Sequence, residues 1–250
     1  MIKVFYFGYR RWARSILLEL LRHKNNMWRI SEVFSPTQSD ESFDALGIPH
    51  KAIDPKNIYS PMLWAELALH KPAVLLFYGW SWMIPPQLYE HYTCLILHPS
   101  PLPKYRGGSP IQNQIIAGET TSAVSIIATV AAVDAGDIYA QLPFSLKGNL
   151  SDIFARIVKG GTKTTKQVLD EIATSTAHPH RQDTSQATTA KRRKPSESEI
   201  TTDEIKTSTA RELYNKIRAL GKPYPLPYIV GKDGKKVLIT GAKLDPHEIA

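Results

Sequence analysis

Leu95-Ile-Leu-His-Pro-Ser-Pro-Leu-Pro-Lys-Tyr-Arg-Gly-Gly108 is the stretch around which the rest of the chain is organised. It opens with an apolar run typical of a buried strand, places His98 at the end of that run, and continues through three prolines into a basic, glycine-ended loop. Each proline fixes one φ angle, so we expect a stiff loop. The pattern predicts that His98 and Ser100 are held at the carboxyl edge of a sheet, where open α/β sheets bind ligands.

The composition is that of a globular protein. Of 250 residues, 42% are hydrophobic and 22% are charged, which allows a sizeable core. No apolar run approaches the length of a membrane span, and the strand-like start Met1 to Gly8 lacks the architecture of a cleavable signal. Cys94 is the single cysteine, which excludes an internal disulfide and fits a reducing compartment. We therefore expect a cytoplasmic protein with no membrane partner.

The formal net charge of +8 comes largely from two clusters, Arg10-Arg11 with Arg14 and Lys191-Arg-Arg-Lys194. Neither cluster alternates with aromatic residues as in a platform for single-stranded nucleic acid, which argues against a nucleic-acid partner. The charge alone is equally consistent with phosphate binding and with ordinary surface charge.

Apolar strand-like runs alternate with helical patterns through the first two thirds of the chain. The runs lie at 2–7, 28–34, 73–78 and 94–97. This alternation predicts an α/β fold with a Rossmann-like, mostly parallel sheet and flanking helices over 1–175. Residues 176–200 have the polar composition of a linker, and 201–250 predict a small C-terminal α+β subdomain with a hairpin.

Two further features lie at predicted strand ends. Trp80 and Trp82 follow an apolar strand, where they could line a pocket for a flat aromatic ligand or pack in the core. The turn Asp134-Ala-Gly-Asp137 interrupts a long β-branched stretch. A carboxylate beside His98 would orient the imidazole and favour its cation, which suits a general base. Spacing alone supports this pair only weakly.

Several ordered motifs resemble the signature of the 10-formyltetrahydrofolate-dependent formyltransferase family. That family includes methionyl-tRNA formyltransferase, glycinamide ribonucleotide formyltransferase and the nucleotide-sugar N-formyltransferases, and the resemblance is greatest to the last group. It spans most of 1–175 and extends into the tail. The motifs are Leu97-His-Pro-Ser-Pro-Leu-Pro-Lys-Tyr-Arg-Gly107, Ser109-Pro-Ile-Gln112, Val133-Asp-Ala-Gly-Asp137, Arg192-Arg-Lys-Pro195, Ile217-Arg-Ala-Leu220 and Pro223-Tyr-Pro225.

The resemblance implies roles for the matching positions. His98 would assist deprotonation of the attacking amine and stabilise the tetrahedral intermediate, while Asp134 would hold the imidazole and help to move the proton. Two loops would enclose the pterin of the co-substrate 10-formyltetrahydrofolate, and no metal is implied. Their residues are Trp80, Trp82, Met83, Ile84 and Pro85 in one loop, and Val130, Val133 and Gly136 in the other.

One position departs from the family pattern. The family's catalytic asparagine falls two residues before the histidine, where this chain has Ile96. Such an oxyanion donor is typically worth about 10²–10³ in rate, and isoleucine cannot donate. Either a neighbour substitutes, with Ser100, Gln112 and Asn113 as candidates, or the transfer differs from the standard one, or the protein is slow.

The resemblance also bears on the acceptor. A tail of about 50 residues is short beside the fuller C-terminal barrel of methionyl-tRNA formyltransferase, whereas glycinamide ribonucleotide formyltransferases lack such a tail. We therefore expect a small primary amine, with an amino sugar on a nucleotide diphosphate as the leading candidate. Arg10 and Arg11 could meet its pyrophosphate at the first helix, with Arg106 as a third substrate contact. Exposed arginines on a turn explain Arg10 and Arg11 equally well.

Three alternatives stay open. Ile96 supports a catalytically impaired protein that binds folate or a nucleotide sugar without turnover. Water in place of the amine would give a formyltetrahydrofolate hydrolase, and a methionyl-tRNA formyltransferase-like enzyme is the third. A homodimer formed through a sheet edge or the tail is compatible with the sequence.

Overall fold

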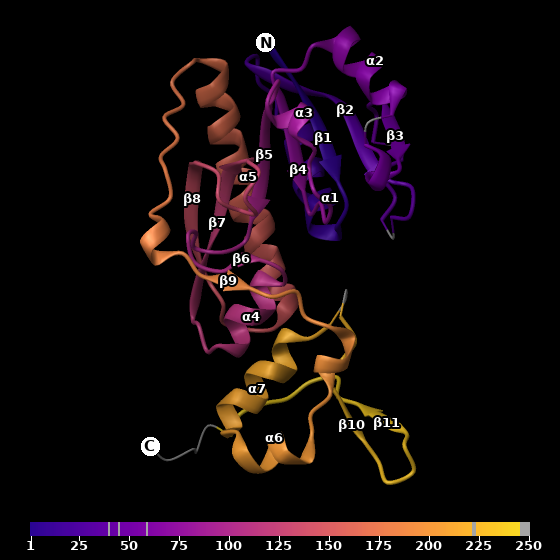
Figure 1. The fold of residues 1–250 in the computed structure, drawn as a ribbon, viewed down its shortest axis with the longest axis vertical. Coiled ribbons are helices and arrows are strands. Elements are labelled where there is room, and N and C mark those ends of the chain that lie inside the picture. The colour runs from indigo at the N-terminus through magenta and orange to yellow at the C-terminus, as the bar shows by residue number, and fades with distance from the viewer. Residues whose placement is uncertain (40, 45, 59, 222–223, 246–250) are drawn as a thin grey trace.

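A computed structural model of the chain describes residues 1–39, 41–44, 46–58, 60–221 and 224–245. Pro223 of the motifs above and residues 246–250 of the predicted C-terminal subdomain lie outside these ranges. The described residues form a seven-stranded sheet in the order β3-β2-β1-β4-β5-β7-β8 (Figure 1). Its strands are β1 (Ile2–Gly8), β2 (Trp28–Pro36), β3 (His50–Ile53), β4 (Val74–Tyr78), β5 (Thr93–His98), β7 (Thr121–Ala128) and β8 (Ile138–Ser145).

Pairing within the sheet is parallel from β3 to β5. Strand β7 runs antiparallel to β5, and β8 runs antiparallel to β7. The mostly parallel α/β sheet expected from the sequence is therefore confirmed. Strand β5 lies inside the sheet with β4 on one side and β7 on the other, so the histidine at its end is surrounded by structure.

Helices cover both faces of the sheet. They are α1 (Arg11–Leu21), α2 (Pro61–His70), α3 (Pro86–Tyr89), α4 (Pro110–Ile116) and α5 (Leu150–Ala173), with a 3₁₀ turn at Pro55–Asn57. Side chains alternate along each strand, so Val4 and Tyr6 join a core with α1 and α5, whereas Phe5 and Phe7 join a second core with α2 and α3. This two-sided burial explains why β1 is almost uniformly apolar.

A third apolar cluster lies on β5, β7 and β8, on the part of the sheet face that the second core leaves uncovered. It contains Leu102, Ile127 and Ile138, and Ile96 packs against it. The cover here is not a helix of the α/β repeat but the loop after His98, which contributes Leu102. The catalytic candidates therefore lie where loops replace helices on the sheet.

The chain after α5 returns to the loop that follows His98. Short strand β9 (Thr189–Ala190) pairs in parallel with β6 (Arg106–Gly107), and Figure 1 shows this crossing between the sheet and the C-terminal part. The remaining elements are η2 (Thr184–Gln186), η3 (Pro195–Ser198), α6 (Thr202–Thr207), α7 (Ala210–Ala219), β10 (Tyr228–Val230) and β11 (Lys236–Leu238). Helix α7 packs against α4.

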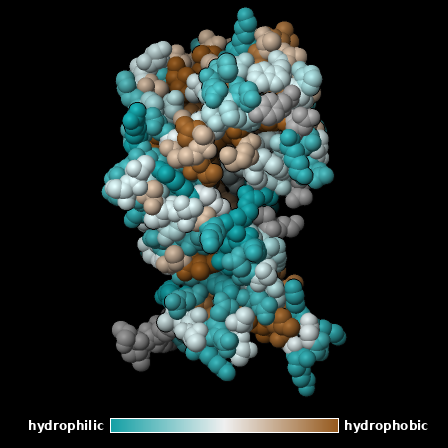
Figure 2. Space-filling view, in the orientation of Figure 1, coloured by the Kyte–Doolittle hydropathy of each residue, from teal (hydrophilic) through white to brown (hydrophobic). Residues whose placement is uncertain are grey.

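The antiparallel hairpin of β10 and β11 confirms the hairpin expected in the tail. Its apolar side chains are exposed, with Ile229, Val230, Val237 and Leu238 between 36% and 58% accessible. Figure 2 shows hydrophobic side chains gathered over this hairpin at the lower right. Contiguous apolar patches often mark interaction surfaces, but the expected homodimer stays a prediction. Among the described residues, no helix is long and apolar enough to cross a membrane.

Candidate functional site

His98 and Asp134 meet although 36 residues separate them in the chain. His98 ends β5, and Asp134 lies in the loop between β7 and β8. The distance between His98 Nδ1 and Asp134 Oδ2 is 3.3 Å, and the two side chains are 8% and 11% exposed. The Gly107 amide donates a hydrogen bond of 2.8 Å to the same Oδ2. The carboxylate is thus held between the imidazole and the loop that follows it.

The second ring nitrogen of His98 also faces an acceptor. Nε2 lies 2.9 Å from the carbonyl oxygen of Tyr105. A carbonyl can only accept, so Nε2 must carry a proton to make this hydrogen bond. Nε2 can take up a proton only after the ring has given up its bond to Tyr105.

Backbone strain is concentrated in this site. Tyr105, Ser109 and Asp134 have φ values of 60°, 51° and 50°, which place three non-glycine residues in the left-handed region. Each such residue costs on the order of 1–3 kcal/mol, and strain of this kind clusters at functional sites. The surrounding contacts must therefore hold these loops in place.

The chain that returns after α5 supplies part of that support. The Arg106 and Gly108 amides donate to the carbonyls of Thr188 and Ala190, each at 2.9 Å. A Cβ atom on Gly108 would lie 2.5 Å from Arg192 Cα, so only glycine permits this crossing. Residues 176–200, expected as a linker, thus contact the loop that carries the candidate site.

Of the predicted pterin loop, Trp80, Ile84 and Pro85 face inward. The Trp80 ring contacts Phe7 and Phe77 edge-on, with centroid distances of 6.0 and 5.8 Å. Ile84 is 8% exposed, and Pro85 is buried beside it. Trp80 thus packs against the core with one side of its ring and stays half-buried, and its contact with a pterin remains a prediction.

Other members of the two loops remain accessible. Met83 is 67% exposed, and Val130 and Val133 in the second loop are 39% and 54% exposed. Trp82 stays half-buried, 5.2 Å from the Trp80 centroid. Gly136 packs so closely that a Cβ would lie 1.9 Å from the Ala128 carbonyl oxygen. Apolar surface is thus available on both loops.

Ile96 lies on the same face of β5 as His98, two residues earlier. Its register partners are Phe77 on β4 and Ile127 on β7. The side chain is half-buried and packs against both the second core and the Leu102 cluster. The position that carries asparagine in the family pattern is therefore occupied here by an apolar contact between these two clusters.

The three candidates to replace that asparagine differ in their surroundings. Ser100 is fully buried, and its hydroxyl donates to the Lys104 carbonyl at 2.9 Å. Asn113 Nδ2 donates to the carbonyls of Gly108 and Lys191, each at 3.0 Å. The donor protons of both side chains are therefore already engaged in hydrogen bonds to backbone carbonyls. Gln112 lies on α4 and is 4% exposed.

The predicted substrate arginines are placed at different parts of the site. The Arg10 guanidinium stacks over the Tyr9 ring at 4.0 Å, and its Nη2 lies 3.4 Å from Ser81 Oγ beside the tryptophan loop. Arg11 is exposed at the start of α1. Arg106 points to Gln182, whose Oε1 lies 3.0 Å from its Nε and 2.7 Å from its Nη2.

Gln182 is a site residue that was not predicted from the sequence. It is 8% exposed and hydrogen-bonds to both loops of the site. No signal marks it in the sequence, because it stands alone in a polar, low-complexity stretch and two of its four side-chain hydrogen bonds go to backbone carbonyls.

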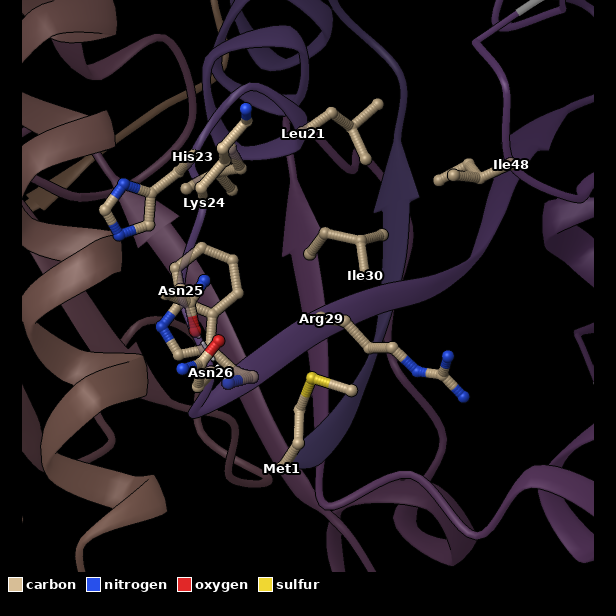
Figure 3. Close-up of a pocket in the computed structure, with 11 residues that line it drawn as sticks. Met1, Leu21, His23, Lys24, Asn25, Asn26, Arg29, Ile30 and Ile48 are labelled. Atoms are coloured by element: carbon tan, nitrogen blue, oxygen red, sulfur yellow. Dashed lines mark hydrogen bonds between the residues drawn. The ribbon is translucent and has the colours of Figure 1, made fainter.

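Two other features lie away from His98. A cavity of about 530 Å³ lies between the end of α1 and the start of β2, at the amino edge of the sheet, and Figure 3 shows the residues that line it. Elsewhere, ligand atoms of Glu32, Glu66 and His70 lie within 4.8 Å of one another. The Lys51 ammonium lies 3.1 Å from Glu32 Oε1 and 2.5 Å from Glu66 Oε1. A cation is therefore already supplied to this cluster by the chain itself.

Several known proteins are similar to this chain. The formyl transferase family matches residues 32–169, which include both His98 and Asp134. A methionyl-tRNA formyltransferase of Lysinibacillus sphaericus is 30% identical over 196 residues, covering 76% of this chain and 59% of that protein. The chain thus spans about three fifths of the length of this relative.

Solved structures share the fold over nearly the whole chain. A 4-N formyltransferase from Francisella tularensis has a TM-score of 0.79 at 22% identity, with 98% of each chain covered. Methionyl-tRNA formyltransferase from Clostridium thermocellum has a TM-score of 0.69 at 25% identity, covering 96% of this chain and 97% of that one. With the family match extending over more than half of its residues, the chain belongs to the formyl transferase family, whose members are enzymes that transfer formyl groups.

Proposed function

We propose that the chain is an N-formyltransferase that moves a formyl group from 10-formyltetrahydrofolate to a primary amine, namely an amino sugar carried on a nucleotide diphosphate. The observation that carries this proposal is the 3.3 Å contact of His98 Nδ1 with Asp134 Oδ2 at the end of β5. A carboxylate that orients an imidazole is the arrangement that general acid–base catalysis of amine transfer requires.

The residues of the two loops fit the pterin of the co-substrate. Met83, Val130 and Val133 offer exposed apolar surface for the flat ring. Within the described chain, the buried atoms Trp80 Nε1 and Thr129 Oγ1 have no hydrogen-bond partner. Unpaired buried polar groups are rare and often belong to binding sites. These residues would hold the folate, which would supply the electrophilic formyl carbon.

His98 would act as the proton acceptor for the attacking amine. In the neutral tautomer that carries its proton on Nδ1, Nε2 makes no bond to the Tyr105 carbonyl and can receive the proton of the amine. Once protonated, Nε2 would donate to Tyr105 O, from which it lies 2.9 Å away, while Nδ1 faces Asp134 Oδ2 at 3.3 Å. These neighbours would orient the ring, and the Gly107 amide would hold the Asp134 carboxylate in place.

Two observations support a nucleotide-linked amino sugar as acceptor. The fold matches a sugar N-formyltransferase from Shewanella with a TM-score of 0.78, against 0.69 for the Clostridium thermocellum methionyl-tRNA formyltransferase. Arg11 is exposed at the first turn of α1, and Arg10 lies beside the tryptophan loop. Positive charge at a helix N-terminus favours a pyrophosphate.

A methionyl-tRNA acceptor is the second candidate, because the sequence relatives at 25–30% identity carry that name. The experiment that separates them is a spectroscopic assay of tetrahydrofolate release from 10-formyltetrahydrofolate, with nucleotide-linked amino sugars or methionyl-tRNA as acceptor.

Release that depends on one amino sugar supports the proposal, and release that depends on methionyl-tRNA selects the second candidate. Formate produced without any amine would identify a hydrolase. Folate binding by calorimetry without release under any condition would identify a binding protein and contradict the transferase.

A further inference from the structure

We infer that Gln182 is a positioning residue, whose carboxamide fixes the loop carrying Asp134 against the loop that follows His98. The inference rests on the proposed function, since it concerns how the histidine and the aspartate of that reaction are brought together. Gln182 lies 48 residues after Asp134 and comes from the segment between α5 and β9. It touches neither side chain of the pair.

Every hydrogen-bonding position of this carboxamide is used. Nε2 donates to the carbonyl oxygens of Asp134 at 2.9 Å and of Gly136 at 2.7 Å. Oε1 accepts from Nε and Nη2 of Arg106 at 3.0 and 2.7 Å. A carboxamide has two donor protons and two acceptor lone pairs, so its capacity is filled. A side chain satisfied so completely and 8% exposed has one well-defined orientation.

The loop that it holds needs such a restraint. Asp134 has a φ of 50°, a conformation that a non-glycine residue does not keep without support. On the other side of the turn, Gly136 lies so close to the Ala128 carbonyl that no side chain would fit there. The two carbonyls bound by Gln182 belong to these two residues, so the carboxamide restrains the turn at its two tightest points.

The same contacts close a ring through the catalytic pair. Gln182 binds the backbone of Asp134, Asp134 Oδ2 accepts from the Gly107 amide, and the neighbouring Arg106 returns to Gln182. Displacing the carboxamide would therefore move Asp134 relative to His98 Nδ1. Misplacement of a catalytic group by about 1 Å can cost about 10²-fold in rate.

Gln182 is itself held from both sides in the chain. His180 and Ile138 exchange two backbone hydrogen bonds, of 3.0 and 2.8 Å. Six residues after Gln182, the Thr188 carbonyl accepts from the Arg106 amide at 2.9 Å. The segment is thus fastened to β8 and to the His98 loop, which gives Gln182 a rigid base.

The test is the variant Gln182→Glu, which keeps the shape and the acceptor for Arg106 but loses both donors. Gln186→Glu is the matched control, because Gln186 is exposed in the same segment and its side chain donates to Asp183 Oδ2 at 3.1 Å, away from both loops of the site. We expect Gln182→Glu to lower kcat by about 10- to 100-fold with little change in KM for the folate. The control should match the wild type.

Hydrogen–deuterium exchange at the Gly107 amide gives a readout that needs no substrate. This amide is protected by Asp134, so its exchange should accelerate in Gln182→Glu and stay slow in the control. Unchanged kcat and unchanged exchange in a folded Gln182→Glu protein would overturn the inference. If that variant does not fold, Gln182→Met is measured in the same way. A wild type without transfer activity would refute the proposed function, while exchange would still decide the role of Gln182.

Discussion

Replacing Ile96 with asparagine restores to β5 the donor that the family pattern has two residues before the histidine. The position shares a face with His98 and lies between Phe77 and Ile127 in the sheet. Ser100 and Asn113 already donate to backbone carbonyls. We therefore predict that Ile96→Asn raises kcat, because the developing negative charge gains a donor that the native chain does not provide there.

The substitution has two effects: it should raise the rate and lower the stability of the fold. A single oxyanion donor is worth about 10²-fold or more in rate, which is about 2.7 kcal/mol of activation free energy. Ile96 is half-buried, so losing its apolar contacts costs about 1 kcal/mol of unfolding free energy. An unpaired amide adds about 1–3 kcal/mol. The variant should thus be faster but less stable by about 2–4 kcal/mol.

The assay is tetrahydrofolate release at saturating substrates, paired with urea unfolding of the same preparations. Ile96→Leu is the control, since it preserves apolar volume and offers no donor, and its kcat should match the wild type. A folded Ile96→Asn protein with unchanged kcat would refute the reasoning. It would mean that another group already stabilises the charge, and Gln112 on α4 would be the first residue to replace.

Three further predictions concern the buried Glu32, its neighbour Glu66 and Cys94. Lys51→Met leaves the Glu32 carboxylate, 1% exposed, without its cation, so urea unfolding should show a loss of about 3 kcal/mol. The control Lys163→Met, at an exposed position on α5, should show no such loss. A hydrogen bond from the Lys51 ammonium lowers the pKa of Glu66 from its ordinary value of 4.5. The Lys51–Glu66 pair therefore stabilises the fold above pH 4.5, and this stabilisation is lost as the pH falls below that value. The difference in unfolding free energy between the wild type and Lys51→Met should shrink over the same range. Burial raises the pKa of the Cys94 thiol to about 12, so a disulfide reagent at pH 8 should label the native protein far more slowly than the urea-unfolded chain, and equal rates would contradict the buried position.

Much of the sheet could be predicted because its strands are continuous apolar runs. The run at 73–78 became β4 and the run at 94–97 became β5, with His98 as its last residue. Burial on both faces removes the alternation of polar residues and leaves a signal that length and flanking turns can identify. The hairpin near the C-terminus could also be predicted, because Gly231 and Gly234 mark its turn.

The candidate site was predictable only in part. His98 and Asp134 stand in recognisable motifs at strand ends, whereas Gln182 binds backbone carbonyls, and a contact of that kind leaves no pattern in the sequence. The polar composition of 176–200 indicated a linker because composition reports exposure, not the hydrogen bonds that fasten the segment to Arg106 and Gly108. Trp80 was ambiguous because an aromatic residue after a strand serves a pocket or a core equally well.

The central claim is that the His98 and Asp134 pair performs the formyl transfer. The most direct measurement is the rate of tetrahydrofolate release by His98→Ala and the wild type, with folate affinity measured by calorimetry for both. His91→Ala is the control, because His91 is exposed and its ring Nδ1 lies 3.1 Å from the Gln87 carbonyl oxygen, away from the candidate site. We expect His98→Ala to abolish release and to leave folate affinity nearly unchanged. Release by His98→Ala at the wild-type rate would contradict this claim.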